Sequence, residues 1–178
     1  MSRITVVEYD PAWPSLFQER ASAIATLLSP YILEIHHIGS TAVPGLAAKP
    51  KIDIDAVITD EGALPELKLR LCGAGYAFHG DPHGSDLWTF TADTRPYGTR
   101  LYLCGRGNAA HAARILFRDQ LHDAPELASR YEALKRQLAA QADGDWDIYI
   151  HGKRAFIDDV LAIAATKKAP PLPAEPLY

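Results

Sequence analysis

Apolar and polar residues alternate over residues 52–58, where every second position carries an aliphatic side chain. Strand side chains point to opposite faces with a period of two, so Asp53 and Asp55 share one face of a predicted strand. A second run of β-formers at residues 35–38 precedes it and ends at a Gly-Ser-Thr turn, residues 39–41. This part of the chain therefore predicts strand, tight turn, connection and strand.

The rest of the apolar pattern predicts a mixed α/β first half and a helical second half. Helical spacing of large apolar residues predicts a helix that begins at Asp10, with Pro11 in its first turn, and ends before Pro30. Further strands are predicted at residues 4–7, 76–78, 87–91 and 99–104. Further helices are predicted at residues 61–71, 112–118, 127–138 and 156–164, with a turn at residues 143–146.

Two adjacent carboxylates on one strand face repel each other unless a proton or a cation lies between them. A divalent metal with hard oxygen ligands meets this requirement for Asp53 and Asp55, and Mg²⁺ usually recruits substrate phosphates as well. The acidic pair does not distinguish Mg²⁺ from Mn²⁺. The turn at residues 39–41 offers backbone N–H groups and hydroxyls to a phosphate. The pattern predicts a nucleoside-triphosphate site, and a surface hairpin with solvated acids is the plainer alternative.

The stretch HIGSTAVPGLAAKPKIDID resembles the signature of the GrpB family, which belongs to the nucleotidyltransferase superfamily. That superfamily is marked by Gly-Ser, a spacer of about a dozen residues, and Asp-x-Asp or Asp-x-Glu. The resemblance implies an α/β fold with a nucleotidyltransferase-like mixed β-sheet, flanking helices and a C-terminal helical part. It extends to Ala165 through shorter matches at residues 9–13, 117–119 and 131–135, and at Tyr149 and Lys153.

We expect one domain over residues 1–166, with the sheet part at about residues 1–106 and the helical part at about 107–166. Residues 167–178 form a proline-rich tail. No signal-peptide pattern opens the chain, and no apolar run is long enough to span a bilayer. The two cysteines indicate no disulfide framework, which is typical of a cytoplasmic protein.

The residues and the resemblance together define an expected site. Asp53 and Asp55 are the expected catalytic residues and metal ligands. The turn would hold the terminal phosphates, and Lys49 or Lys51 would neutralise them, although solubility alone explains these lysines equally well. Arg114 and Arg136 are expected on solvated faces instead. The residues expected to bind nucleotide or phosphate are Gly39, Ser40, Thr41, Lys49, Arg100, Arg118 and Lys135.

The function that the resemblance implies is Mg²⁺-dependent transfer of a nucleoside monophosphate from an NTP to a small-molecule or protein acceptor. Active nucleotidyltransferases usually present a third carboxylate from a neighbouring strand. The predicted strand at residues 99–104 contains no acid, and Asp86 and Asp93 only flank the strand before it. A non-catalytic nucleotide-binding or accessory module is therefore the alternative, linked to coenzyme A metabolism because GrpB-like domains occur fused to dephospho-CoA kinase. A metal-dependent phosphohydrolase is a third option.

Charge and the remaining motifs exclude several other classes. The net charge of −4 argues against a dedicated, sequence-blind nucleic-acid binder, which is usually basic. The P-loop and Rossmann glycine motifs are absent. His36 and His37 point to opposite sides of their predicted strand, and for both a core or surface role is favoured over ligation.

Overall fold

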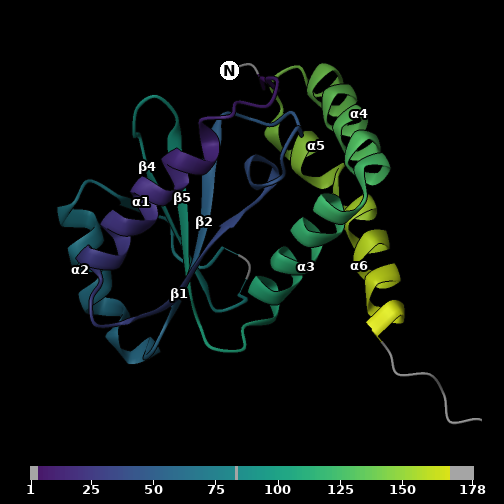
Figure 1. The fold of residues 1–178 in the computed structure, drawn as a ribbon. Helices are drawn as coiled ribbons and strands as arrows, with labels where there is room; N and C mark the ends of the chain where they lie inside the picture. Colours follow the sequence, from purple (N-terminus) through teal and green to yellow (C-terminus); the bar gives the residue numbers. More distant parts are fainter. Residues whose placement is uncertain (1–3, 83, 169–178) are drawn as a thin grey trace, which may run out of the picture.

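The centre of the molecule is a five-stranded mixed sheet with the order β1-β2-β5-β4-β3. The computed structural model describes residues 4–82 and 84–168. In Figure 1, α1 and α2 lie on one side of the sheet, and α3, α4, α5 and α6 lie on the other. The strands are β1 (Ile32–Ile38), β2 (Lys51–Ile58), β3 (Ala77–Phe78), β4 (Leu87–Ala92) and β5 (Gly98–Gly105). Strands β2 and β5 are parallel neighbours, and the predicted mixed α/β architecture is confirmed.

One face of the sheet forms the main apolar core under α1 (Trp13–Leu27) and α2 (Leu64–Gly73). The alternating apolar residues of β2 all lie on this face, because side chains two apart on a strand point the same way. Buried members of this core include Trp13, Ile24, Ile52, Ile54, Leu67, Leu71, Phe90 and Leu101. The intervening residues of β2 and β5, among them Asp53 and Arg100, therefore face the helical half.

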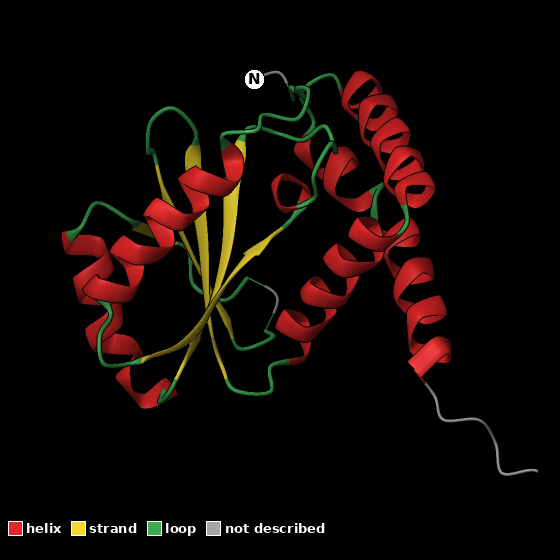
Figure 2. Ribbon diagram, in the orientation of Figure 1, coloured by secondary structure: helices red, strands yellow, loops and turns green. Residues whose placement is uncertain are grey.

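The helical half contains α3 (Ala109–Asp123), α4 (Pro125–Ala142), α5 (Trp146–His151) and α6 (Arg154–Lys168), as Figure 2 shows. Val43 and Leu46, from the connection between β1 and β2, pack in one apolar cluster with Leu121 and Tyr131 of these helices. This cluster holds the turn after β1 against the helices. Within the described residues, no helix combines the length and apolar character that a membrane crossing requires.

Two predicted boundaries at the N-terminal end are wrong. Residues 4–7 form only an isolated bridge, from Val7 to Ala48, because Ile4 packs against α4 and α5 instead of extending the sheet edge. Helix α1 begins at Trp13 rather than at Asp10. The Asp10 Oδ1 atom accepts a hydrogen bond of 2.8 Å from the Ala12 backbone N–H, which closes a turn ahead of the helix.

The C-terminal end also differs from the sequence pattern. The predicted turn at residues 143–146 is shorter, because Asp145 caps a further helix, α5, by accepting from the N–H of Asp147 at 2.9 Å. Helix α6 continues through Lys168, into the first two residues of the predicted tail. The rest of that tail, residues 169–178, lies outside the described residues.

Candidate functional site

A cavity of about 240 Å³ lies between the polar face of the sheet and the helical half. The turn after β1, the centre of the sheet and four helical segments all contribute to its wall. Among residues 4–82 and 84–168, six lysine or arginine side chains line it, against one carboxylate. These charged residues are Lys49, Lys51, Asp53, Arg100, Arg114, Lys135 and Lys153. A cavity with this excess of positive charge favours an anionic ligand.

The floor of the cavity follows from the parallel register of β2 and β5, which places Asp53 beside Arg100. Asp53 Oδ1 and Arg100 Nε are both buried, and neither has a hydrogen-bond partner in the part of the chain that the structure describes. A buried polar atom without a partner costs about 1–3 kcal/mol. An acceptor and a donor that are both unsatisfied at neighbouring positions indicate a place prepared for a ligand with cationic and anionic parts.

The turn after β1 closes one side of the cavity and requires glycine at position 39. Gly39 has φ 73° and ψ −173°, and it precedes the 3-10 turn Ser40–Ala42. A Cβ atom on Gly39 would lie 2.9 Å from Asp53 Oδ2, and Cβ atoms in proteins essentially never come that close to another heavy atom. Glycine therefore lets the backbone of the turn contact the carboxylate directly.

Substitution of Gly39 by alanine is expected to destabilise the fold by more than the backbone strain alone. The strained conformation costs about 1–3 kcal/mol for a residue with a side chain, and contact with Asp53 adds to it. Gly45→Ala is the matched control, because Gly45 has φ +78° but nothing within 4 Å of its Cβ position. Urea unfolding of both variants measures the difference, and equal losses of stability would contradict a close approach of Gly39 to Asp53.

The lysines of the cavity are held at an energetic cost. Burial, with Lys153 and Arg100 nearby, lowers the pKa of Lys49 to about 8. Burial lowers the pKa of Lys135 to about 7, and its ammonium group donates to the Ala47 carbonyl. The pKa of Lys153 is lowered by burial as well. A bound anion would offset the cost of burial and the repulsion between these cations, and it would favour the charged form of the lysines.

Asp55 is fully buried and does not line the cavity, although it shares the face of Asp53. Its Oδ1 accepts from Arg114 Nη1 at 3.0 Å, and its Oδ2 is 2.9 Å from His111 Nδ1. The predicted solvated position of Arg114 is therefore wrong. The guanidinium group reaches from α3 to a buried charge that needs a partner, and it lies 3.7 Å over the ring of Tyr102.

Arg118, a predicted phosphate contact, does not line the cavity. It donates to the His37 carbonyl at 2.9 Å and pairs with Asp119 at 2.7 Å. His37 packs in the core, where its ring stacks on Phe17 with centroids 4.6 Å apart and contacts Thr41 Oγ1 at 3.0 Å. Burial, with Arg118 nearby, lowers the pKa of His37 to about 4, so this ring is neutral at pH 7.

The structure places no third carboxylate beside Asp53 on the neighbouring strand. Arg100 and Tyr102 of β5 are paired with Asp53 and Asp55, and Thr91 of β4 is paired with Arg100. Asp86 and Asp93, which flank β4, are absent from the cavity lining.

The structure brings together most of the expected site and adds residues that the sequence did not assign to it. Of the expected residues, the cavity lining includes Gly39, Ser40, Thr41, Lys49, Asp53, Arg100 and Lys135. The helices add aromatic rings, and the turn between α5 and α6 adds Lys153. Lys153 Nζ lies 4.3 Å from the ring centroid of Tyr149, and Lys49 Nζ lies 5.0 Å from it. Tyr131 could have been assigned to the site from the sequence, because it precedes the expected Lys135 by four residues on the buried face of α4.

Residues 3–162 match the sequence model of a family described as GrpB protein. UPF0157 protein PA4798 of Pseudomonas aeruginosa is 37% identical over 175 residues, covering 93% of this chain and 70% of that protein. UPF0157 protein YqkA of Bacillus subtilis is 31% identical over 155 residues, covering 87% of this chain and 45% of that protein. A protein named dephospho-CoA kinase in Mycolicibacterium paratuberculosis is 29% identical over 181 residues, covering 88% of this chain and 44% of that protein. This chain thus spans less than half the length of two of these relatives.

Two solved structures superpose on this fold. The crystal structure of conserved protein GrpB from Enterococcus faecalis superposes with a TM-score of 0.84 at 31% identity, covering 92% of this chain and 98% of that one. The GLD-2/RNP-8 complex gives a TM-score of 0.54 at 15% identity, covering 96% of this chain and 64% of that one. The second likeness concerns the fold alone, and the predicted nucleotidyltransferase-like fold is confirmed.

Proposed function

Because the chain belongs to the GrpB family and has a nucleotidyltransferase-like fold, we propose that its cationic cavity binds a nucleoside triphosphate. The pair of unpartnered buried atoms at the floor, Asp53 Oδ1 and Arg100 Nε, carries this proposal. A triphosphate supplies several acceptor oxygens for guanidinium and ammonium donors. A metal bound to the triphosphate would supply a partner for the buried Asp53 Oδ1.

The size of the cavity supports the same ligand. Pockets that enclose a drug-sized molecule usually measure about 300–1,000 Å³. The volume here, about 240 Å³, suits the compact triphosphate better than a whole nucleotide. The six cationic side chains line this cavity, where the negative charge of the ligand would be greatest.

The residues fit a Mg²⁺ ion at Asp53 but not at Asp55 in this arrangement. Asp53 has an unpartnered oxygen, and burial raises the pKa of its carboxyl group against the opposing effect of Arg100 and Lys49. Both oxygens of Asp55 are engaged by Arg114 and His111, so it would become a ligand only after losing a partner. Mg²⁺ held by Asp53 would offset charge on the phosphates.

Transfer of a nucleoside monophosphate to an acceptor is a second candidate, favoured by Asp53 beside the Gly39 turn on this fold. Binding is the better supported of the two, because the cavity offers one carboxylate rather than three. The relative named dephospho-CoA kinase favours an accessory form of the same proposal. In that form, the domain binds a nucleotide on behalf of a coenzyme A enzyme.

Calorimetric titration with ATP, with and without Mg²⁺, tests the proposal. We expect Mg²⁺ to tighten ATP binding by roughly tenfold or more, since a contact to a charged group is worth about 1.5–3 kcal/mol. Asp53→Asn should abolish this Mg²⁺ dependence and leave Mg²⁺-free binding unchanged or tighter, because it removes a charge that repels phosphate.

Asp93→Asn is the matched control, because Asp93 lies close enough to Lys51 to affect its pKa but does not line the cavity. This variant should bind ATP like the wild type. Failure of ATP, GTP, CTP, UTP and dephospho-CoA to bind would overturn the proposal, as would a full Mg²⁺ effect in Asp53→Asn. Mg²⁺-dependent release of pyrophosphate would establish transfer over binding alone.

A further inference from the structure

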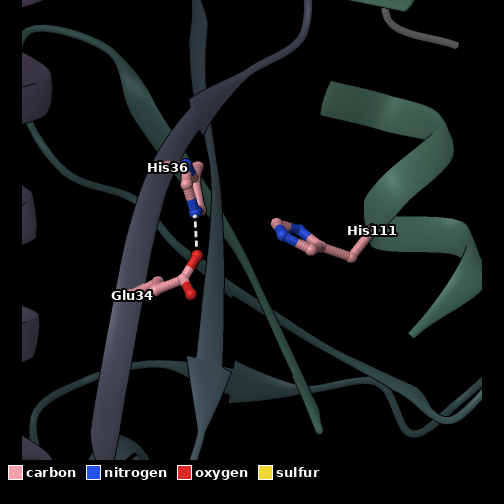
Figure 3. A group of neighbouring side chains, drawn as sticks. All are labelled: Glu34, His36 and His111. Atoms are coloured by element: carbon pink, nitrogen blue, oxygen red, sulfur yellow. Dashed lines mark hydrogen bonds and ion pairs between the residues drawn. The ribbon is translucent and has the colours of Figure 1, made fainter. Parts of the chain in front are cut away.

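Three metal-ligating side chains converge outside the cavity: Glu34 and His36 on β1, and His111 on α3. One potential ligand atom from each lies within 4.8 Å of the others. His36 Nε2 is 2.9 Å from Glu34 Oε2, and the rings of His36 and His111 are 5.1 Å apart. Figure 3 shows the His111 ring pointing from its helix toward the two residues on the strand.

The strand supplies two of these groups by its periodicity. Glu34 and His36 are two residues apart, so both point to the same side of β1. Strand β1 is an edge of the sheet, and both side chains reach solvent, with exposed fractions of 61% and 29%. They can therefore adjust their rotamers without disturbing the core.

His111 is held in place from two directions. Its backbone N–H donates to the Asn108 side chain at 3.0 Å in the cap of α3, and the Asn108 amide donates in turn to the Ser85 carbonyl at 2.8 Å. Its Nδ1 donates to the buried Asp55 carboxylate, which leaves Nε2 as the free nitrogen of the ring. A carboxylate behind an imidazole is the usual support of a metal-binding histidine, because it fixes the tautomer and the ring orientation.

We propose that Glu34, His36 and His111 bind a divalent transition metal of the Zn²⁺ type between β1 and α3. Two imidazoles and one carboxylate are a common ligand set for Zn²⁺, with a solvent molecule in the fourth position. Zinc–ligand distances of about 2.0–2.2 Å require ligand atoms separated by roughly 3.3 Å. The present spread of up to 4.8 Å would close by a shift of the exposed Glu34 and the partly exposed His36.

A surface ion pair explains only part of this arrangement. Such a pair accounts for the contact of His36 with Glu34. It does not account for His111, whose side chain is 13% exposed, oriented by Asp55 and directed at the same point. A metal satisfies all three groups at once.

Titration of the full chain with Zn²⁺, in competition with a chromophoric chelator, tests the site. Cys72 is replaced by serine throughout, because an exposed free thiol can bind Zn²⁺ at a second place. We expect one tight Zn²⁺ per chain, and a loss of affinity of roughly tenfold or more in both His36→Ala and Glu34→Gln. Co²⁺ substitution should give the visible absorption of a four-coordinate site in the Cys72→Ser parent, and this absorption should be lost in His36→Ala and in Glu34→Gln.

His122→Ala is the matched control, because His122 is an exposed histidine that also lies beside a carboxylate, 3.5 Å from Asp123. It should bind Zn²⁺ like its parent. The inference is overturned if the parent binds no Zn²⁺, if His36→Ala and Glu34→Gln both keep full affinity, or if His122→Ala loses as much. Circular dichroism of the metal-free variants separates loss of a ligand from loss of the fold. Nucleotide binding is measured independently, so either result leaves the cavity proposal intact.

Discussion

Replacement of Asp55 by asparagine is expected to lower the free energy of unfolding by about 3 kcal/mol, the lower end of the range for breaking a buried ion pair. The Asp55 side chain is fully buried, and it pairs with Arg114 and His111. Asparagine keeps the size but removes the charge, so the guanidinium group keeps its desolvation cost without its partner. The value lies at the low end because the Arg114 side chain is 28% exposed and rests on Tyr102. Urea unfolding at neutral pH measures the loss.

Asp158→Asn is the control for this loss. Asp158 forms an ion pair with Arg154 in which both side chains are largely exposed, and such pairs contribute about 0–1 kcal/mol. A loss in Asp55→Asn no larger than that in Asp158→Asn would show that the buried pair does not hold α3 against the sheet.

Asp53→Asn should behave in the opposite way. Burial raises the pKa of Asp53, so its folded-state pKa exceeds the unfolded value. The ionised form is therefore destabilising above the unfolded pKa, and a neutral amide removes that cost. At neutral pH this variant should be at least as stable as the wild type. The two carboxylates on this face of β2 would then differ in role, with Asp55 stabilising the fold and Asp53 available to a ligand.

The fold was largely predictable because its strongest signals are local. Alternation along β2 and the apolar spacing of α1 and α4 depend on the period of each element and on the side that it buries. One error occurred where a long-range contact decided the outcome. Ile4 packs against the helical half, and the chain before Val7 therefore adds no strand to the sheet.

The candidate site was predictable at its strand and turn, and less so at its walls. Gly39 directly follows Ile38, which is paired with Asp53 in the antiparallel register of β1 and β2, so two neighbouring strands of the chain carry the information. Arg114 is brought to Asp55 by the packing of α3, which no local pattern encodes. His111 reaches the same carboxylate for the same reason, and the sequence distinguished neither Asp55 from Asp53 nor His111 from a surface histidine.

Arg100→Gln should weaken binding of ATP with Mg²⁺ by roughly 10–100-fold, because a hydrogen bond to a charged group is worth about 1.5–3 kcal/mol. Arg100 is the cation nearest to Asp53 in the strand register, and its Nε has no partner among the described residues. Glutamine preserves the polar character of the side chain and part of its length while removing the charge. The fold should tolerate the change, because no hydrogen bond of Arg100 Nε is lost. Isothermal titration calorimetry measures the affinity.

Arg118→Gln is the control that makes this result specific. Arg118 was expected from the sequence to contact phosphate, but it lies outside the cavity lining and pairs with Asp119 and the His37 carbonyl. The Arg118→Gln variant should therefore keep its ATP affinity within about twofold of the wild type, because the charge it loses lies beyond contact distance and is screened by salt. If Arg118→Gln lost as much affinity as Arg100→Gln, the ligand would be held by the general positive field of the helical half. Loss in Arg100→Gln alone would assign the phosphates to the floor of the cavity, beside Asp53.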